Sequence, residues 1–391
     1  MDQPGKISAG EIVKRSPDPA VRWLHHGDEF LACVLESLRS ARHSVRLEMY
    51  IFANDPTGLS VRAALAEAAG RGVSVRVMTD ALGSAALPGN FWEPLVTAGG
   101  EVKVFNPLSH RRLMVRNHRK LLVVDDAIAI LGGFNIADEY TGDGVAAGWA
   151  DCGLTLKGVS LAALSRSFER MFARCDEQQP RLVAARLRKG ERPPPEEFAP
   201  KMLLLENGPG RQPSAFQKLL RHDIARSREV FFVSAYFLPG YRMRRILRGI
   251  AQRGARVQII VPGKSDVPVS QRAARFLYAG LMRAGVEIWE DQPQVLHAKL
   301  FLANGSVYAG SSNLDTRSLH LNHEIMLCLG DPAVVAGARE LFAELLSHSR
   351  RIDPEAWKNS RSRWEKLREQ VAFWLLSRVD PYLTRWLAQG K

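Results

Sequence analysis

This 391-residue sequence lacks long apolar runs. Its longest strongly apolar stretches, such as Val230-Phe231-Phe232-Val233, are far shorter than the roughly 20 residues that a helix needs to cross a bilayer. The first thirty residues carry several charges and no apolar segment of the signal-peptide kind. We therefore expect no secretory leader and no spanning helix, so that any membrane contact would be peripheral.

Cysteine is also scarce. Cys33, Cys152, Cys175 and Cys328 show no CxxC or other metal-binding spacing, and they lie in or beside apolar runs. This pattern indicates buried free thiols rather than disulfides or a metal centre. We expect a reduced, cytoplasmic compartment and no metal site.

Acidic residues are outnumbered. The chain has 54 Lys and Arg against 41 Asp and Glu, a formal net charge of +13. Such a surplus favours a negatively charged partner, which can be nucleic acid, an anionic membrane surface or a phosphorylated small molecule. Charge alone does not choose among them. The hydrophobic fraction of 46% and the charged fraction of 24% are those of a globular protein.

An internal repeat organises the chain. Residues 44–78 predict a strand, a helix and a second strand, and residues 229–260 predict the same series. Each half then closes with a strand and an amphipathic helix, at 152–175 and 325–348, where Asp331 is expected to cap the second helix. The internal repeat has a period of 179 residues (297 − 118 = 179), which is too long for a solenoid. We predict an α/β protein of two similar domains, each a mixed, largely parallel sheet flanked by helices.

The predicted boundaries follow composition. Residues 1–175 form the first domain, the Arg- and Pro-rich residues 176–201 a linker, and residues 202–352 the second domain. The tail, 353–391, combines tryptophan with basic residues on helical segments. That composition is typical of a membrane-interface element, and it fits equally well a helix packed on the core.

A short motif recurs in both halves. His118 and Lys120 are two residues apart on a predicted strand, as are His297 and Lys299, so that both side chains point from one face. After a turn and a pair of small residues each copy ends in an asparagine, Asn135 (135 − 118 = 17) and Asn313 (313 − 297 = 16). Two such half-sites can make one whole site.

These residue types suit phosphoryl chemistry. Small residues before each asparagine let a phosphate oxygen approach the backbone. Lysine and asparagine donors can stabilise the oxygens of a phosphoryl group in transit. A neutral imidazole can attack phosphorus, whereas an imidazolium can protonate a leaving alkoxide, so two histidines can divide these roles.

The double motif resembles that of the phospholipase D superfamily, in which HxKxxxxD followed by G-S-x-N occurs twice per active site. The resemblance covers nearly the whole chain and is closest to bacterial cardiolipin synthases that lack N-terminal membrane spans. The residues that carry it include Tyr50-Ile51-Phe52, Gly132-Gly133-Phe134-Asn135, Ala235-Tyr236-Phe237-Leu238-Pro239-Gly240-Tyr241 and Gly310-Ser311-Ser312-Asn313-Leu314-Asp315. It implies one active site at the interface of the two domains.

The resemblance further implies a carboxylate after each motif histidine, bonded to its far ring nitrogen. By position these are Asp151 for His118 (151 − 118 = 33) and Glu324 for His297 (324 − 297 = 27), unless both are ordinary strand-end carboxylates. Such a partner fixes the tautomer of the ring and stabilises its charged form.

The second motif departs from the pattern because Asn304 replaces its aspartate. Asn304-Gly305 between apolar runs is a strong hairpin signal, so we expect Asn304 and its counterpart Asp125 to have structural roles in the turn.

The small residues and one arginine complete the expected site. Gly133 stands where the pattern has serine, which puts a hydroxyl contact in the first half in doubt. We expect Gly133, Ser311 and Arg116 to contact the substrate. Arg116 follows the basic run His110-Arg111-Arg112, which fits equally the mouth of the site and a solvated loop.

The resemblance implies a cardiolipin synthase, which transfers a phosphatidyl group from one phosphatidylglycerol to another phospholipid or alcohol through a phosphatidyl-histidine and requires no cofactor. Its partner would be an anionic phospholipid surface, with no obligate nucleic acid, at the cytoplasmic side of a bacterial inner membrane. The alternatives are a phospholipase D-type hydrolase or nuclease, and an inactive membrane-binding scaffold.

Overall fold

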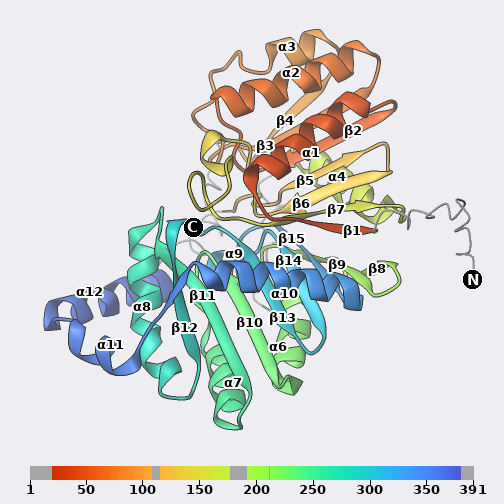
Figure 1. Ribbon diagram of the computed structural model, residues 1–391. Helices are drawn as coiled ribbons and strands as arrows, with labels where there is room; N and C mark the ends of the chain where they lie inside the picture. The colour runs from red at the N-terminus through yellow and green to blue at the C-terminus, as the bar shows by residue number, and fades with distance from the viewer. Residues whose placement is uncertain (1–19, 108–114, 177–191, 211, 380–391) are drawn as a thin grey trace, which may run out of the picture.

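The chain forms two mixed β-sheets flanked by helices (Figure 1). This computed structural model describes residues 20–107, 115–176, 192–210 and 212–379. The elements of the first half are β1 (Val21–Leu24), α1 (Gly27–Ser40), β2 (Ser44–Met49), α2 (Pro56–Gly70), β3 (Ser74–Asp80), α3 (Glu93–Thr97), β4 (Glu101–Phe105), β5 (Leu121–Val124), β6 (Ile128–Gly132), β7 (Gly153–Lys157) and α4 (Ala162–Arg174).

The second half repeats this plan with additions. Its elements are β8 (Glu196–Ala199), β9 (Met202–Asn207), α6 (Ala215–Arg226), β10 (Glu229–Ser234), α7 (Tyr241–Gln252), β11 (Arg256–Lys264), α8 (Pro268–Met282), β12 (Glu287–Val295), β13 (Lys299–Ala303), β14 (Ser306–Gly310), α9 (Thr316–His320), β15 (Glu324–Leu329), α10 (Pro332–Ser347), β16 (Ser349–Arg351), α11 (Pro354–Ser360) and α12 (Arg363–Trp374). The predicted repeat is confirmed, since β2 pairs parallel with β3 and β10 with β11.

The sheets are mainly antiparallel, so the prediction of largely parallel sheets is wrong. The first sheet has the order β1-β7-β6-β5-β2-β3-β4, and only β2-β3 and β3-β4 are parallel. The second has the order β16-β12-β11-β10-β13-β14-β15-β9-β8, with only β10-β11 and β11-β12 parallel. Helical crossovers join the parallel strands, whereas short turns such as that between β13 and β14 enforce antiparallel pairing.

The sheets and helices stack in layers (Figure 1). One apolar core lies between the first sheet and helices α1 and α2. A second core is shared by the inner faces of both sheets with α4 and α10. A third lies between the outer face of the second sheet and α6, α7 and α8. Because the middle core contains side chains from both halves, the halves form one body.

The predicted linker and tail differ partly from the structure. Residues 177–191 lie outside the described part of the chain, but Glu196–Ala199 of the predicted linker form the edge strand β8. In the tail, α12 packs against α8, and Phe373 stacks on Phe276 with ring centroids 4.8 Å apart. The tail therefore contains a helix packed on the core, and residues 380–391 lie outside the described part.

Candidate active site

Backbone pairing between the halves builds the site. The amide of His118 donates to the carbonyl of His323 at 3.0 Å, and the amide of His323 donates to the carbonyl of Arg116 at 2.9 Å. On the other side the amide of His297 donates to the carbonyl of Ala150 at 2.7 Å. Each histidine is thus held beside the residue that precedes a carboxylate of the opposite half. His118 and Lys120 lie just before β5 rather than within a strand.

The two histidine–carboxylate pairs cross between the halves. Nδ1 of His118 lies 3.1 Å from Oε2 of Glu324, and Nδ1 of His297 lies 2.6 Å from Oδ2 of Asp151. The expected pairing within each half is therefore wrong. Its reason is the backbone pairing, which places Glu324 after His323 and Asp151 after Ala150. In both pairs the bonded Nδ1 leaves Nε2 as the ring nitrogen available for chemistry.

The lysines lie buried against the same rings. Nζ of Lys120 donates to the carbonyl of His118 at 2.8 Å, and Nζ of Lys299 donates to the carbonyl of His297. Nζ of Lys299 also lies 2.8 Å from Nδ1 and 3.2 Å from Nε2 of His297. Burial, together with the neighbouring ammonium of Lys299, lowers the pKa of Lys120 to about 7. Two lysine side chains therefore lie against the motif histidines, and the charge they carry would stabilise a phosphoryl group bound between those rings.

Burial favours the neutral form of both imidazoles. Burial, then the Lys299 ammonium, lowers the pKa of His297 to about 4, although Asp151 opposes the shift. Burial likewise lowers the pKa of His118 against the opposing effect of Glu324. Burial raises the pKa of Asp151, but Lys299 and His297 outweigh it and the net shift is downward, so this carboxylate stays charged.

The asparagines supply amide donors. Oδ1 of Asn135 accepts a hydrogen bond from the amide of Ile51 at 3.0 Å, which fixes the side chain. Among the described residues its buried Nδ2 has no partner within hydrogen-bond distance, although the Asn135 side chain is near enough to Tyr140 to interact with its hydroxyl, and Asn135 lines the pocket. An unpaired buried donor is costly unless a ligand satisfies it. In the second half, Oδ1 of Asn313 accepts from the amide of Tyr236 at 3.4 Å.

One pocket of about 310 Å³ joins both histidines and both asparagines, whereas Lys120 and Lys299 are not among its lining residues. It is lined from both halves by Tyr50, Ile51, Leu82, Arg116, His118, Asn135, Tyr140, Trp149, Tyr236, Asp266, Val267, His297, Asn313, Asp315, Arg317, Ser318 and Asn322. Aromatic rings frame the histidines, with Tyr50 4.7 Å from His118 and Tyr140 5.2 Å from His297 between ring centroids. The predicted single site between the halves is present.

Of the three residues expected to contact the substrate, Gly133 and Ser311 do not line the pocket. A Cβ at Gly133 would lie 2.0 Å from Oδ1 of Asp151, so glycine makes room for that carboxylate. The Ser311 hydroxyl donates to Oε2 of Glu324 at 2.5 Å. Neither residue lines the pocket, and both instead position a carboxylate. Arg116 does line it, while its guanidinium is held by Asp80 at 3.2 Å.

The two motif-end residues lie in turns. The Asp125 carboxylate accepts from the amides of Arg42, His43 and Ser44 at 2.7–2.8 Å. Asn304 has φ +51° in the turn between β13 and β14, so the predicted hairpin is confirmed. Both positions are remote from the pocket lining, which supports the structural role expected for them.

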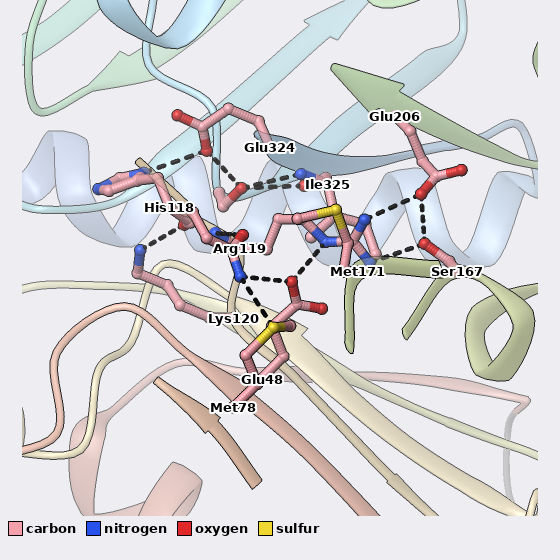
Figure 2. A network of polar contacts seen from close by, with 12 residues as sticks. Glu48, Met78, His118, Arg119, Lys120, Ser167, Met171, Glu206, Glu324 and Ile325 are labelled. Carbon is pink, nitrogen blue, oxygen red and sulfur yellow. Dashed lines mark hydrogen bonds and ion pairs between the residues drawn. The ribbon is translucent and has the colours of Figure 1, made fainter. Parts of the chain in front are cut away.

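Arg119, between His118 and Lys120, belongs to a buried ion network that the motif did not reveal. Its guanidinium lies 3.1 Å from Glu48 and 2.9 Å from Glu206, which is on β9 of the other half. Ser167 accepts from Nη2 at 2.7 Å. Figure 2 shows this network extending from the His118–Glu324 pair toward Glu206 and Ser167. Arg119 therefore ties the His118 segment to the second half.

The described residues contain no cluster of three or more His, Cys, Asp or Glu side chains that could hold a metal ion. Within those same residues, no helix has both the length and the apolar character needed to span a membrane.

Comparison with known proteins identifies the family. The family model for cardiolipin synthase, phospholipase D-like domain, matches residues 34–170 and 220–346. Cardiolipin synthase B of Salmonella typhi is 30% identical over 374 residues, covering 94% of this chain and 90% of that protein. Cardiolipin synthase A of Pseudomonas fluorescens is 30% identical over 362 residues, covering 90% and 73%.

Solved structures share the fold. The phosphatidylserine synthase of Haemophilus influenzae aligns with a TM-score of 0.70 at 15% identity and covers 95% of each chain. The polyphosphate kinase of Porphyromonas gingivalis aligns with a TM-score of 0.55 at 16% identity, covering 99% of this chain and 57% of that one. With two matched domains and one shared site, the chain belongs to the cardiolipin synthase family of the phospholipase D superfamily.

Proposed function

We propose that this enzyme transfers a phosphatidyl group from one phosphatidylglycerol to a hydroxyl of a second phospholipid or alcohol, releasing glycerol and yielding cardiolipin when the acceptor is phosphatidylglycerol. The observation that carries the proposal is the pocket in which His118 and His297, each oriented by a carboxylate of the opposite half, face a common space. The named activity of the relatives supports it.

In the first displacement, Nε2 of His118 attacks the phosphorus and the bond to the glycerol oxygen breaks. His297, as imidazolium, gives its Nε2 proton to the departing alkoxide, so glycerol leaves neutral. The phosphatidyl group remains on His118, and Glu324 stabilises the positive charge that develops on that ring.

In the second displacement, the now neutral His297 removes a proton from the acceptor hydroxyl. The acceptor oxygen attacks phosphorus, the bond from phosphorus to nitrogen breaks, and His118 returns to its neutral form. Two in-line displacements leave the configuration at phosphorus unchanged. Each proton and bond is accounted for by the two histidines, and the proposal needs no metal.

The negative charge of the bound substrate favours uptake from solvent of the proton that His297 must donate. Burial, and then the ammonium groups of Lys299 and Lys120, oppose protonation of this ring, whereas Asp151 favours it. A bound phosphodiester anion offsets both charges and raises the pKa of His297. The lysines and the unpaired Nδ2 of Asn135 then face the phosphate oxygens, which become most negative in the transition state.

We further propose that the enzyme works peripherally at the cytoplasmic side of a bacterial inner membrane. The substrate is a membrane lipid, and the +13 net charge favours an anionic surface.

The test offers the purified protein vesicles of phosphatidylglycerol and, separately, an oligonucleotide. We expect cardiolipin and glycerol in equal amounts from the wild type, none from His118→Ala, and a wild-type yield from His222→Ala, which changes an exposed histidine outside the pocket. Phosphatidic acid alone would identify a hydrolase, and a cleaved oligonucleotide a nuclease. No product from any substrate would identify a scaffold.

A further inference from the structure

Helix α12 packs one face on the core and exposes the other to solvent. Toward the core, Ala372 is buried and Phe373 stacks on Phe276 of α8. Toward solvent, an apolar stripe runs along the helix. It consists of Trp364, Leu367, Val371, Trp374 and Leu375, the two tryptophans being 72% and 57% exposed. The spacing of three, four, three and one residues keeps all five on one side of the helix.

Helix α12 is packed against the protein, so its apolar stripe does not belong to an unattached terminal segment. On α11 the Trp357 ring lies 5.0 Å from that of Tyr278, and Arg361 covers Trp357 at 4.3 Å. Arg361 also pairs with Glu369 of α12 at 2.5 Å. A rigid helix that exposes two tryptophans and three aliphatic side chains leaves a contiguous apolar surface in water, and such patches mark interaction sites.

The surroundings of the stripe are basic. Arg363, Lys366 and Arg368 are exposed on α12 itself. Of the two acidic residues of the helix, Glu369 is buried in a pair with Arg361, whereas Glu365 is exposed and accepts a hydrogen bond from the amide of Ser362 in the helix cap. Positive charge therefore dominates the side chains that α12 presents to solvent.

We propose that this stripe on α12, with the exposed side chains of Arg363 and Arg368 beside it, is a docking face for an anionic lipid bilayer. Tryptophan and leucine enter the boundary between headgroups and acyl chains, while arginine and lysine contact the lipid phosphates. The basic rim selects a lipid surface over a neutral apolar partner. A second copy of the chain would carry the same positive charge and would be repelled.

The face is close to the active site. Helix α8 begins at Pro268, directly after the pocket-lining residues Asp266 and Val267, and α12 packs along it. From Val267 to Phe276 the helix rises about 14 Å (nine residues at about 1.5 Å each). Docking through α12 would therefore hold the pocket near the bilayer, and for this consequence the inference rests on the proposed lipid substrate.

The experiment measures flotation of the full-length protein with vesicles of phosphatidylcholine, with and without phosphatidylglycerol. We expect the wild type to bind the anionic vesicles and to be partly released by salt. The double variant Trp364→Gln/Trp374→Gln should bind about tenfold or more weakly, because two indoles no longer leave water. The matched control, Val96→Gln/Val104→Gln, changes two exposed apolar residues of the first half and should bind like the wild type.

Activity separates this inference from the proposed function. On dispersed short-chain phosphatidylglycerol the tryptophan variant should turn over like the wild type, whereas on vesicles it should be slower. Wild-type vesicle binding by the variant would overturn the docking face, as would a wild-type dimer that Trp364→Gln/Trp374→Gln converts to a monomer. Intact vesicle binding with no turnover of either substrate would instead refute the proposed function.

Discussion

The carboxylate of Asp151, in the first half, lies 2.6 Å from Nδ1 of His297, in the second half. The reciprocal contact joins Glu324 to His118 at 3.1 Å. Neither half therefore holds a histidine together with its own orienting carboxylate. The duplication has produced one site that requires both copies.

The crossed pairing predicts which step each carboxylate serves. Asp151→Asn should impair His297 and so slow proton transfer to the leaving group, while Glu324→Gln should impair nucleophilic attack by His118. Each should reduce the rate on phosphatidylglycerol by about 10²–10⁴. The measurement compares phosphatidylglycerol with a phosphatidyl ester of p-nitrophenol, whose departure needs no acid.

On the nitrophenyl ester, Asp151→Asn should release the first equivalent of nitrophenol almost as fast as the wild type, while Glu324→Gln should remain slow. The opposite assignment, with Asp151→Asn slow and Glu324→Gln fast, would show that each carboxylate serves the histidine of its own half.

Gly133 is expected to be intolerant of any side chain. Because a Cβ there would lie 2.0 Å from Oδ1 of Asp151, Gly133→Ala must displace the carboxylate from His297. We predict a loss of activity comparable to that of Asp151→Asn, measured as kcat on phosphatidylglycerol. The matched change Ser311→Ala removes one hydrogen bond to Glu324 and should cost only about tenfold. Full activity in Gly133→Ala would contradict this account of the position.

Arg119 is expected to hold the halves together. Arg119→Met leaves Glu48 buried without the cation that it pairs with and leaves Glu206 with Arg170 alone, and loss of one partner from a buried pair costs about 3–5 kcal/mol. Thermal unfolding should show a lower Tm than for Arg166→Met, which breaks an exposed pair with Glu196. Equal Tm values for the two variants would argue against an anchoring role.

On the nitrophenyl ester, whose first displacement needs no proton from His297, the pH profile of kcat/KM should have two limbs. Burial lowers the pKa of His118 below its ordinary 6.5, so the attacking ring stays neutral and kcat/KM should fall only at pH values below that. Burial and Lys299 lower the pKa of Lys120 to about 7, so kcat/KM should also fall as the pH rises through about 7 and the ammonium loses its proton.

Bound substrate anion favours the charged lysine, so the alkaline limb of kcat should lie at higher pH than that of kcat/KM. Lys120→Arg, whose guanidinium stays charged, should weaken the alkaline limb whatever its absolute rate. A kcat/KM profile flat through pH 7 would contradict the role given to Lys120.

Much of the architecture was readable from local patterns. The strand, helix and strand units follow from periodicity, Asp331 caps α10 as its position predicts, and Asn304-Gly305 forms the hairpin turn. The pocket-lining residues His118, His297 and both asparagines follow from the repeated motif. These features depend on short stretches of sequence.

The features that sequence did not predict depend on contacts across the duplication. Spacing along the chain is the same whether Asp151 faces His118 or His297, and only the pairing of the His297 segment with Ala150 decides it. Arg119 was missed because its partner Glu206 comes from the other half. The sequence shows that glycine replaces serine at position 133. It does not show that the Asp151 carboxylate leaves no room for a side chain there.

The division of labour between His118 and His297 is tested most directly by trapping the intermediate in His297→Ala with the nitrophenyl ester. Attack by His118 needs no acid with this substrate, but the second displacement lacks its base, so the adduct should accumulate. We predict a burst of one nitrophenol per enzyme. After proteolysis at mildly alkaline pH, a phosphatidyl group should be found on the peptide that contains His118. His118→Ala should show neither the burst nor the adduct. A burst and adduct on His297 in His118→Ala, and none in His297→Ala, would reverse the assignment.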